Sequence, residues 1–162
     1  MTLVLGIDPG TATTGYGFVK GGNDGRLEAV SFGIIRTPPG VEAHRRLSLL
    51  FHQLNELLIL HRPDSVAVEK LFFQRNVSTA IGVGQARGVL LLAISEAGLN
   101  LAEYTPNEVK KAVTGYGSAG KNQVQEMVRI LLELPEIPKP DDAADALAIA
   151  ITHLNTQRLG ET

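Results

Sequence analysis

The chain contains no cysteine among its 162 residues. Disulfide bonds, catalysis by a thiolate and zinc sites built on cysteine are therefore excluded, and any metal must be held by oxygen or imidazole ligands. The histidines are scattered along the sequence, so a histidine-based metal site has little support. The absence of cysteine suits a protein of the cytoplasm, which is where we expect it.

The sequence also lacks long hydrophobic runs. It has no stretch of about 18 apolar residues, the length that predicts a membrane-spanning helix. Its first residues lack the basic segment and cleavage site of a signal peptide. We therefore expect a soluble, unprocessed protein with no membrane association. With 44% hydrophobic residues, the chain fits one globular domain, which we place at residues 1–158, followed by a short tail at residues 159–162.

The chain also has no excess of positive charge. The formal net charge of −2 is unusual for a nucleic-acid binder, because neutralising phosphates requires Lys and Arg. The charges are unevenly distributed, however. Between residues 70 and 121 the basic residues outnumber the acidic ones. The acidic residues of this segment are Glu96, Glu103 and Glu108, and the basic ones are Lys70, Arg75, Arg87, Lys110, Lys111 and Lys121. This segment is locally basic, although ordinary solvated charge accounts for most of these residues taken singly.

Hydrophobic patterning predicts an α/β fold. Two apolar runs without alternation, at residues 3–7 and 65–68, predict strands buried on both faces. Further strands are predicted at residues 16–20, 27–36 and 101–104, and the first three along the chain should form an antiparallel meander. Helical spacing predicts helices near residues 41–61, 78–97, 105–115, 124–132 and 142–157. The last helix is alanine-rich and apolar nearly all round, so it should pack closely against the sheet.

Acidic residues recur where these elements end or begin. Asp8 and Glu69 follow the two buried strands directly, and Asp142 and Asp145 stand in the first turns of the last helix. Ligands of open α/β sheets bind outside the carboxyl ends of the strands. The i, i+3 spacing puts Asp142 and Asp145 on one helix face. The four carboxylates can therefore converge.

Converging carboxylates repel one another and are costly to bury unless a cation lies among them. Ligands that are all oxygen favour Mg²⁺, with Mn²⁺ as a substitute. Two such ions in one site can activate water and stabilise the leaving oxygen of an in-line displacement. We therefore predict a site with two ions that hydrolyses phosphodiester bonds.

Structural roles compete with this interpretation. Asp8 can be a turn residue before glycine, and Asp142 or Asp141 can be a helix N-cap. Glu69 has no obvious structural role at the end of a buried strand. Asp141 is also spaced to share a helix face with Asp145, so spacing alone does not choose between Asp141 and Asp142.

Other patterns are weaker. The glycines at positions 10 and 15 lack the Gly-Lys-Ser/Thr continuation of a Walker loop, and Arg87 stands where a dinucleotide fingerprint needs its third glycine. Gly84 and Gly88 belong to a small-residue face that suits either an internal helix contact or a dimer contact. Phe72, directly after the Glu69 strand, can stack on unpaired bases, and Lys110 and Lys121 can contact phosphates. From the same basic segment we add Arg75 as an expected DNA contact.

Taken together, these motifs resemble RuvC-type Holliday junction resolvases over essentially the whole chain. The matching segments are residues 6–10, 14–17, 68–72 with Asn76, 84–89, 109–110, 117–119 with Lys121, and 142–150. The resemblance implies a ribonuclease H-like fold, with a mixed five-stranded sheet whose first three strands are antiparallel, flanked by helices. It also implies a homodimer that nicks strands of the same polarity in a four-way DNA junction, leaving 5′-phosphate and 3′-hydroxyl ends, and that works with a RuvA/RuvB-type branch-migration complex.

The resemblance also implies roles for individual residues. The family's metal-binding acids match Asp8, Glu69, Asp142 and Asp145, which favours Asp142 over Asp141. Phe72 matches an aromatic residue that stacks on junction bases, and Lys110 and Lys121 match residues that contact DNA near the scissile phosphate. The helix with Gly84 and Gly88 matches the dimer helix. Some relatives carry His at the position of Asp142, and a basic C-terminal tail found in some of them has no counterpart in this chain.

Three rival hypotheses remain at this point. A YqgF-like nuclease shares the Gly-Ile-Asp-Pro-Gly start, but residues 84–89 and 142–149 favour the resolvase. Actin-like and sugar-kinase ATPases have a similar phosphate loop, but they need two such domains. The third alternative is a junction-binding protein without catalytic activity.

Overall fold

The computed structural model describes residues 1–10, 12–70 and 77–160. Over these residues the chain forms a five-stranded sheet with the strand order β3-β2-β1-β4-β5. The strands are β1 (Thr2–Asp8), β2 (Thr13–Gly21), β3 (Leu27–Arg36), β4 (Ser65–Glu69) and β5 (Asn100–Tyr104). The pairs β1–β2 and β2–β3 are antiparallel, whereas β1–β4 and β4–β5 are parallel. The predicted antiparallel meander and mixed sheet are confirmed.

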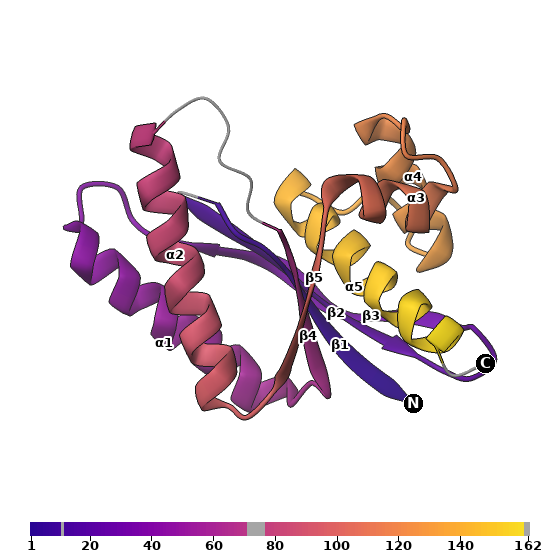
Figure 1. Cartoon of the computed structure of the whole chain (residues 1–162), viewed down its shortest axis with the longest axis horizontal. Coiled ribbons are helices and arrows are strands. Elements are labelled where there is room, and N and C mark those ends of the chain that lie inside the picture. The colour runs from indigo at the N-terminus through magenta and orange to yellow at the C-terminus, as the bar shows by residue number, and fades with distance from the viewer. Residues whose placement is uncertain (11, 71–76, 161–162) are drawn as a thin grey trace.

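Helices cover both faces of this sheet (Figure 1). They are α1 (Ala43–His61), α2 (Val77–Glu96), α3 (Pro106–Thr114), α4 (Lys121–Leu131) and α5 (Asp141–Gly160). Leu5 and Ile7 of β1 belong to the core beneath α1 and α2, whereas Val4 belongs to the core shared with α5. This alternation follows from the period of two along a strand.

Helix α5 lies directly on β1 and β2 because glycine leaves room for it. A Cβ atom added at Gly6 would lie 2.0 Å from the Ala146 carbonyl oxygen, and one added at Gly15 would lie 2.0 Å from that of Asp142. No side chain fits at either position unless the helix moves. The close packing predicted for this helix is therefore confirmed, and its first turn lies at the edge of the sheet where β1 ends.

A buried polar network fixes the other half of α5. His153 of α5 shares a hydrogen bond of 2.7 Å with the Tyr104 hydroxyl of β5 and one of 3.1 Å with the Ser65 hydroxyl of β4. Burial lowers the pKa of His153, so its imidazole is held in the neutral form. Glycine contacts at one end and this network at the other set the position of α5 on the sheet.

The helix limits differ slightly from those predicted. Helix α4 begins at Lys121, ahead of its first apolar residue, and α5 continues to Gly160 instead of ending near Gln157. A capping box begins α3, with Thr105 and Glu108 each bonded to the other's backbone N–H. Among the described residues, the helices are all too short or too polar to cross a membrane.

Candidate active site

Asp8 and Glu69 lie side by side at one edge of the sheet. Strands β1 and β4 are parallel neighbours, and Ile7 is paired with Val68, so the next residue of each strand is an acid at the same level. Asp8 follows Gly6 by two positions, and Gly6 faces α5. Both carboxyl groups therefore leave the sheet on the side where α5 begins, as expected from the two strand ends.

Helix α5 brings Asp142 and Asp145 to the same place. One carboxylate oxygen from each of Asp8, Asp142 and Asp145 lies within 4.8 Å of the other two. The Thr13 hydroxyl donates a 2.6 Å hydrogen bond to Oδ2 of Asp142, which fixes this side chain. The helix begins at Asp141, so Asp142 is inside it and is not an N-cap.

Asp141 points elsewhere, which answers the question that spacing left open. Its carboxylate pairs with the Lys121 ammonium at 2.8 Å and accepts a 3.0 Å hydrogen bond from the Gln125 side chain. It is exposed and outside the carboxylate cluster. Between the two candidates, Asp142 is the one whose side chain lies with Asp8 and Asp145.

Glu69 stands at the side of this cluster. It does not belong to the group of three whose oxygens lie within 4.8 Å of one another. Its carboxyl group nevertheless shares a hydrogen bond with Asp8 and feels the charge of Asp145. The structure thus brings three of the predicted acids into one cluster, with the fourth directly beside Asp8.

The electrostatics of the cluster show how strongly it favours a positive charge. Burial raises the pKa of Asp8 to about 9, and the charges of Asp145, Glu69 and Asp142 add to this effect. Burial also raises the pKa of Glu69 and of Asp145. A divalent cation would replace the shared protons and relieve the repulsion. The donors are all carboxylate oxygens, so they fit a hard ion such as Mg²⁺ or Mn²⁺.

Two of the predicted DNA contacts lie next to the acids. Lys110 and Lys121, together with Glu69 and Asp145, line a cavity of about 330 Å³ whose wall includes the apolar Val109, Val124 and Ile149. Cationic groups at the rim and an apolar wall suit a nucleotide next to a phosphate held by the cluster. The remaining predicted contacts, Phe72 and Arg75, lie outside the described residues.

Arg87 is a residue that the sequence interpretation missed. Its side chain is only 10% exposed; the guanidinium donates a 2.6 Å hydrogen bond to the Glu69 carbonyl oxygen and pairs with Glu103 of β5 at 3.2 Å. It thereby fastens α2 to the ends of β4 and β5, directly behind the Glu69 carboxylate. A signal for this role exists, because Arg87 shares a helix face with Leu90 and Ile94, both buried, and a charge on an apolar stripe needs a partner.

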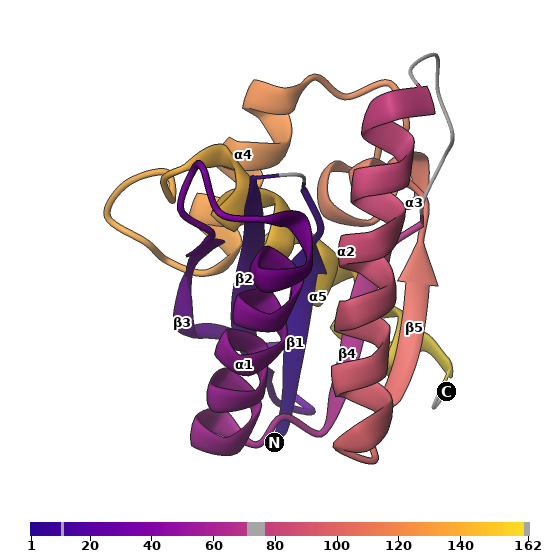
Figure 2. The same cartoon turned by 90° about the vertical axis from the view of Figure 1, so that its left-hand side faces the viewer.

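Gly84 and Gly88 lie on the opposite side of α2 from the sheet. A Cβ atom added at either glycine would meet nothing within 4 Å. Ile81 and Leu92, which are 60% and 52% exposed, continue the same helix face at helical spacing. In Figure 2 α2 stands at the surface of the molecule, with this outward side uncovered by the described elements.

Comparisons of sequence identify relatives over nearly the whole chain. The model of the family described as crossover junction endodeoxyribonuclease RuvC matches residues 4–153. A relative of that name from Heliobacterium modesticaldum is 57% identical over 150 residues, which cover 92% of this chain and 91% of the relative. Another from Thermomicrobium roseum is 52% identical over 158 residues, covering 98% and 96%.

Comparisons of structure identify the same family. Thermus thermophilus RuvC in complex with a Holliday junction substrate matches with a TM-score of 0.90 at 37% identity, over 98% of this chain and 96% of that one. A yeast mitochondrial Holliday junction resolvase matches with a TM-score of 0.68 at 16% identity, over 98% and 82%, and shares the fold. The predicted resemblance and ribonuclease H-like fold are confirmed.

Proposed function

The chain belongs to the RuvC family of crossover junction endodeoxyribonucleases, and we propose that it resolves four-way (Holliday) DNA junctions by a symmetric pair of nicks. The observation that carries the proposal is the convergence of Asp8, Asp142 and Asp145, with Glu69 beside Asp8, at the edge of the sheet. Such a cluster is suited to holding divalent cations against a phosphodiester.

The four acids supply the ligands. We propose that Asp8, Glu69, Asp142 and Asp145 hold Mg²⁺, with Mn²⁺ as a substitute, as two ions in each site. When bound, these ions favour deprotonation of a water molecule and neutralise the charge that develops on the phosphate. Asp8 gives up its proton on binding, because its raised pKa otherwise keeps it protonated at neutral pH.

The other residues of the site position the DNA. Lys110 and Lys121 contact phosphates at the rim of the cavity next to the cluster, and Phe72 and Arg75 contact the junction from the segment after β4. Water adds to the phosphorus atom as the bond to the 3′ oxygen breaks. The products are a 5′-phosphate and a 3′-hydroxyl, so each nick can be ligated.

We also propose a homodimer formed through α2. Ile81, Gly84, Gly88 and Leu92 form a continuous face of small and exposed apolar residues, here called the α2 face. Contact between two such faces would cover surface that is otherwise exposed and hold two sites in a fixed relation. A symmetric dimer matches the symmetry of a four-way junction, and nicks by its two sites would fall on strands of the same polarity.

Family membership supports three further proposals, on the domain, the location and the partner of the protein. We propose that residues 1–158 act as a single nuclease domain, that the protein works in the cytoplasm, and that a RuvA/RuvB-type branch-migration complex is its partner. Each is supported by similarity to bacterial relatives that match over nearly the whole of this chain.

The catalytic proposal can be tested by Asp8→Asn. The variant should bind a synthetic four-way junction as tightly as the wild type but cut it roughly a thousandfold more slowly in Mg²⁺, because loss of a ligand removes several kcal/mol of transition-state stabilisation. Asp24→Asn is the matched control, since Asp24 is exposed in the loop between β2 and β3 and should cut normally. Full activity of Asp8→Asn, or equal losses in both variants, would contradict the assignment.

A further inference from the structure

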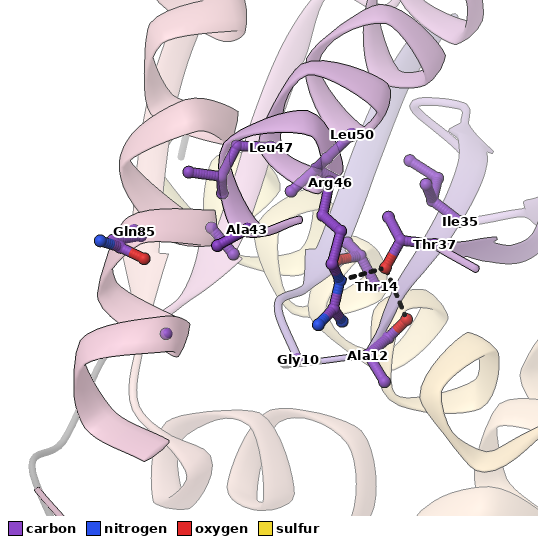
Figure 3. A pocket seen from close by; sticks show the side chains of 12 residues that line it. Gly10, Ala12, Thr14, Ile35, Thr37, Ala43, Arg46, Leu47, Leu50 and Gln85 are labelled. Carbon is purple, nitrogen blue, oxygen red and sulfur yellow. Dashed lines mark hydrogen bonds between the residues drawn. The ribbon is translucent and has the colours of Figure 1, made fainter. Parts of the chain in front are cut away.

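A small pocket opens on the α1 and α2 side of the sheet, at the edge where β1 ends (Figure 3). It has a volume of about 140 Å³ and is lined by the loop after β1, the end of β3, the start of α1 and part of α2. Its polar side chains are Thr14, Thr37, Arg46 and Gln85, and its apolar wall includes Ile35 and Leu50. None of these residues has a part in the site described above.

Arg46 is held in a defined orientation in this pocket. Its Nε donates a 3.3 Å hydrogen bond to the Thr37 hydroxyl, which in turn donates a 3.5 Å bond to the Ala12 carbonyl oxygen. Figure 3 shows the side chain reaching from α1 across the pocket toward Gly10 and Ala12. A guanidinium positioned in advance loses less conformational entropy when it binds an anion.

The surroundings of the pocket favour an anion. Among the residues that the structure describes, the lining includes the cationic Arg46 and the hydroxyls of Thr14 and Thr37 but no acidic side chain. Hydroxyl groups and a guanidinium are the side chains that bind phosphate oxygens in protein–DNA complexes. The apolar wall suits a deoxyribose attached to such a phosphate.

The pocket and the carboxylate cluster share one loop. Asp8 and the Thr13 hydroxyl face the cluster, whereas Gly10, Ala12 and Thr14 line the pocket. The two therefore lie at the same edge of the sheet but on opposite sides of the loop. A DNA backbone engaged at the cluster brings other phosphates of the same junction close to this pocket.

We propose that the pocket is a second phosphate site, in which Arg46, oriented by Thr37, binds a non-scissile backbone phosphate of the junction. This rests on the proposed function, since it assumes that the cluster engages junction DNA. The contact adds affinity without taking part in the chemistry. It fixes the direction in which the DNA leaves the cleavage site.

The test compares Arg46→Gln with Arg45→Gln, both in the Asp8→Asn background so that the junction stays intact. Each change removes one positive charge from adjacent positions of α1, but Arg45 is 70% exposed and paired with Glu42. Junction affinity is measured by fluorescence anisotropy over a range of salt concentrations. Arg46→Gln should weaken binding roughly tenfold and lower the salt slope by about 1, whereas Arg45→Gln should change both much less.

A second measurement identifies the phosphate. Neutral methylphosphonates are placed one at a time in the junction backbone. At one non-scissile position the replacement should lower the junction affinity of the parent protein, whereas it should leave the affinity of Arg46→Gln unchanged. Thermal unfolding of both variants establishes that they are folded. Equal affinities and slopes for Arg46→Gln and Arg45→Gln would overturn the pocket proposal alone, whereas failure of the parent protein to bind the junction would overturn the proposed function.

Discussion

At the residue scale, the four acids are held in an arrangement that is unfavourable without a cation. Asp8 has the pKa raised most clearly, because burial and three neighbouring carboxylates act in the same direction. Burial raises the pKa of Glu69, and the positive charges of Arg87 and Lys110 partly offset this rise. The fold therefore holds a repulsive cluster in place, as expected where ligands must be ready for metal ions.

This arrangement predicts a stability effect of Asp8→Asn that depends on pH. The pKa of Asp8 in the folded protein, about 9, is above its ordinary value of 3.8, so its contribution to stability is complete below pH 3.8 and is lost as the pH rises to about 9. In metal-free solution the variant should therefore become more stable than the wild type, and the difference in unfolding free energy should grow across this window to about 4 kcal/mol near neutral pH. Urea unfolding of both proteins at several pH values measures the difference.

Mg²⁺ should reverse the order of stability. The wild type binds the ion in its folded state and is stabilised by it, whereas the variant has lost a ligand and responds less. A difference between the two proteins that is constant with pH, or unchanged by Mg²⁺, would contradict the assignment of Asp8 to a metal-binding cluster.

Single residues also show what the sequence can reveal. Asp8 and Glu69 were predictable because a buried parallel strand fixes where its last residue lies. Asp142 was not separable from Asp141 by spacing, because both can share a helix face with Asp145. What separates them is the placement of α5 on the sheet, which depends on contacts with Gly6 and Gly15 far away in the sequence.

At the scale of elements, two helices carry the site from opposite faces of the sheet. Helix α5 supplies Asp142 and Asp145, and α2 is fastened to β4 and β5 through Arg87. The positions of both helices depend on long-range contacts. The helices themselves were predictable from local periodicity, but the partner of Arg87 was not, because Glu69 and Glu103 lie on strands on either side of it in the sequence.

Arg87→Met should therefore impair cleavage by displacing the end of β4, not by removing a contact with the DNA. Loss of the bond to the Glu69 carbonyl frees the end of β4, so the Mg²⁺ concentration for half-maximal activity should rise and the rate should fall roughly tenfold to a hundredfold. Junction affinity of the same variant in the absence of metal should stay close to that of the wild type. The measurement is a Mg²⁺ titration of the cleavage rate.

Glu103→Gln provides the comparison for this prediction. It removes the charge partner of Arg87 in β5 but leaves the bond to Glu69 intact. Its effect should be much smaller, because Glu103 is 39% exposed and an ion pair open to water contributes little. If the two variants lose activity equally, the contact with Glu69 is not what positions the site.

At the scale of the whole molecule, the α2 face and the carboxylate edge together define the proposed assembly. The α2 face has open space at Gly84 and Gly88, so a larger residue there fits the monomer but obstructs a partner. Gly84→Glu should therefore give a monomer in sedimentation analysis. Its unfolding temperature should be judged against that of the wild type at the same protein concentration, since dimer formation itself stabilises the fold.

The same variant should lose paired cutting. One site without its partner nicks a junction once and releases it, so symmetric double nicking should disappear first. Ile130→Glu is the control: it introduces the same charge at an exposed apolar residue of α4, away from α2. A dimeric Gly84→Glu protein, or a monomeric Ile130→Glu protein, would contradict the assignment of the interface to the α2 face.

The central claim is that this protein cuts DNA according to branched structure, and one measurement tests it most directly. A synthetic four-way junction and a linear duplex with the same strand sequences are incubated with the wild-type protein and Mg²⁺, and the cut sites are mapped on all strands. We predict two symmetric nicks, on strands of the same polarity, that DNA ligase can reseal, with the linear duplex left intact. Equal cutting of the linear duplex, or a junction that is bound but left uncut in both Mg²⁺ and Mn²⁺, would contradict the claim.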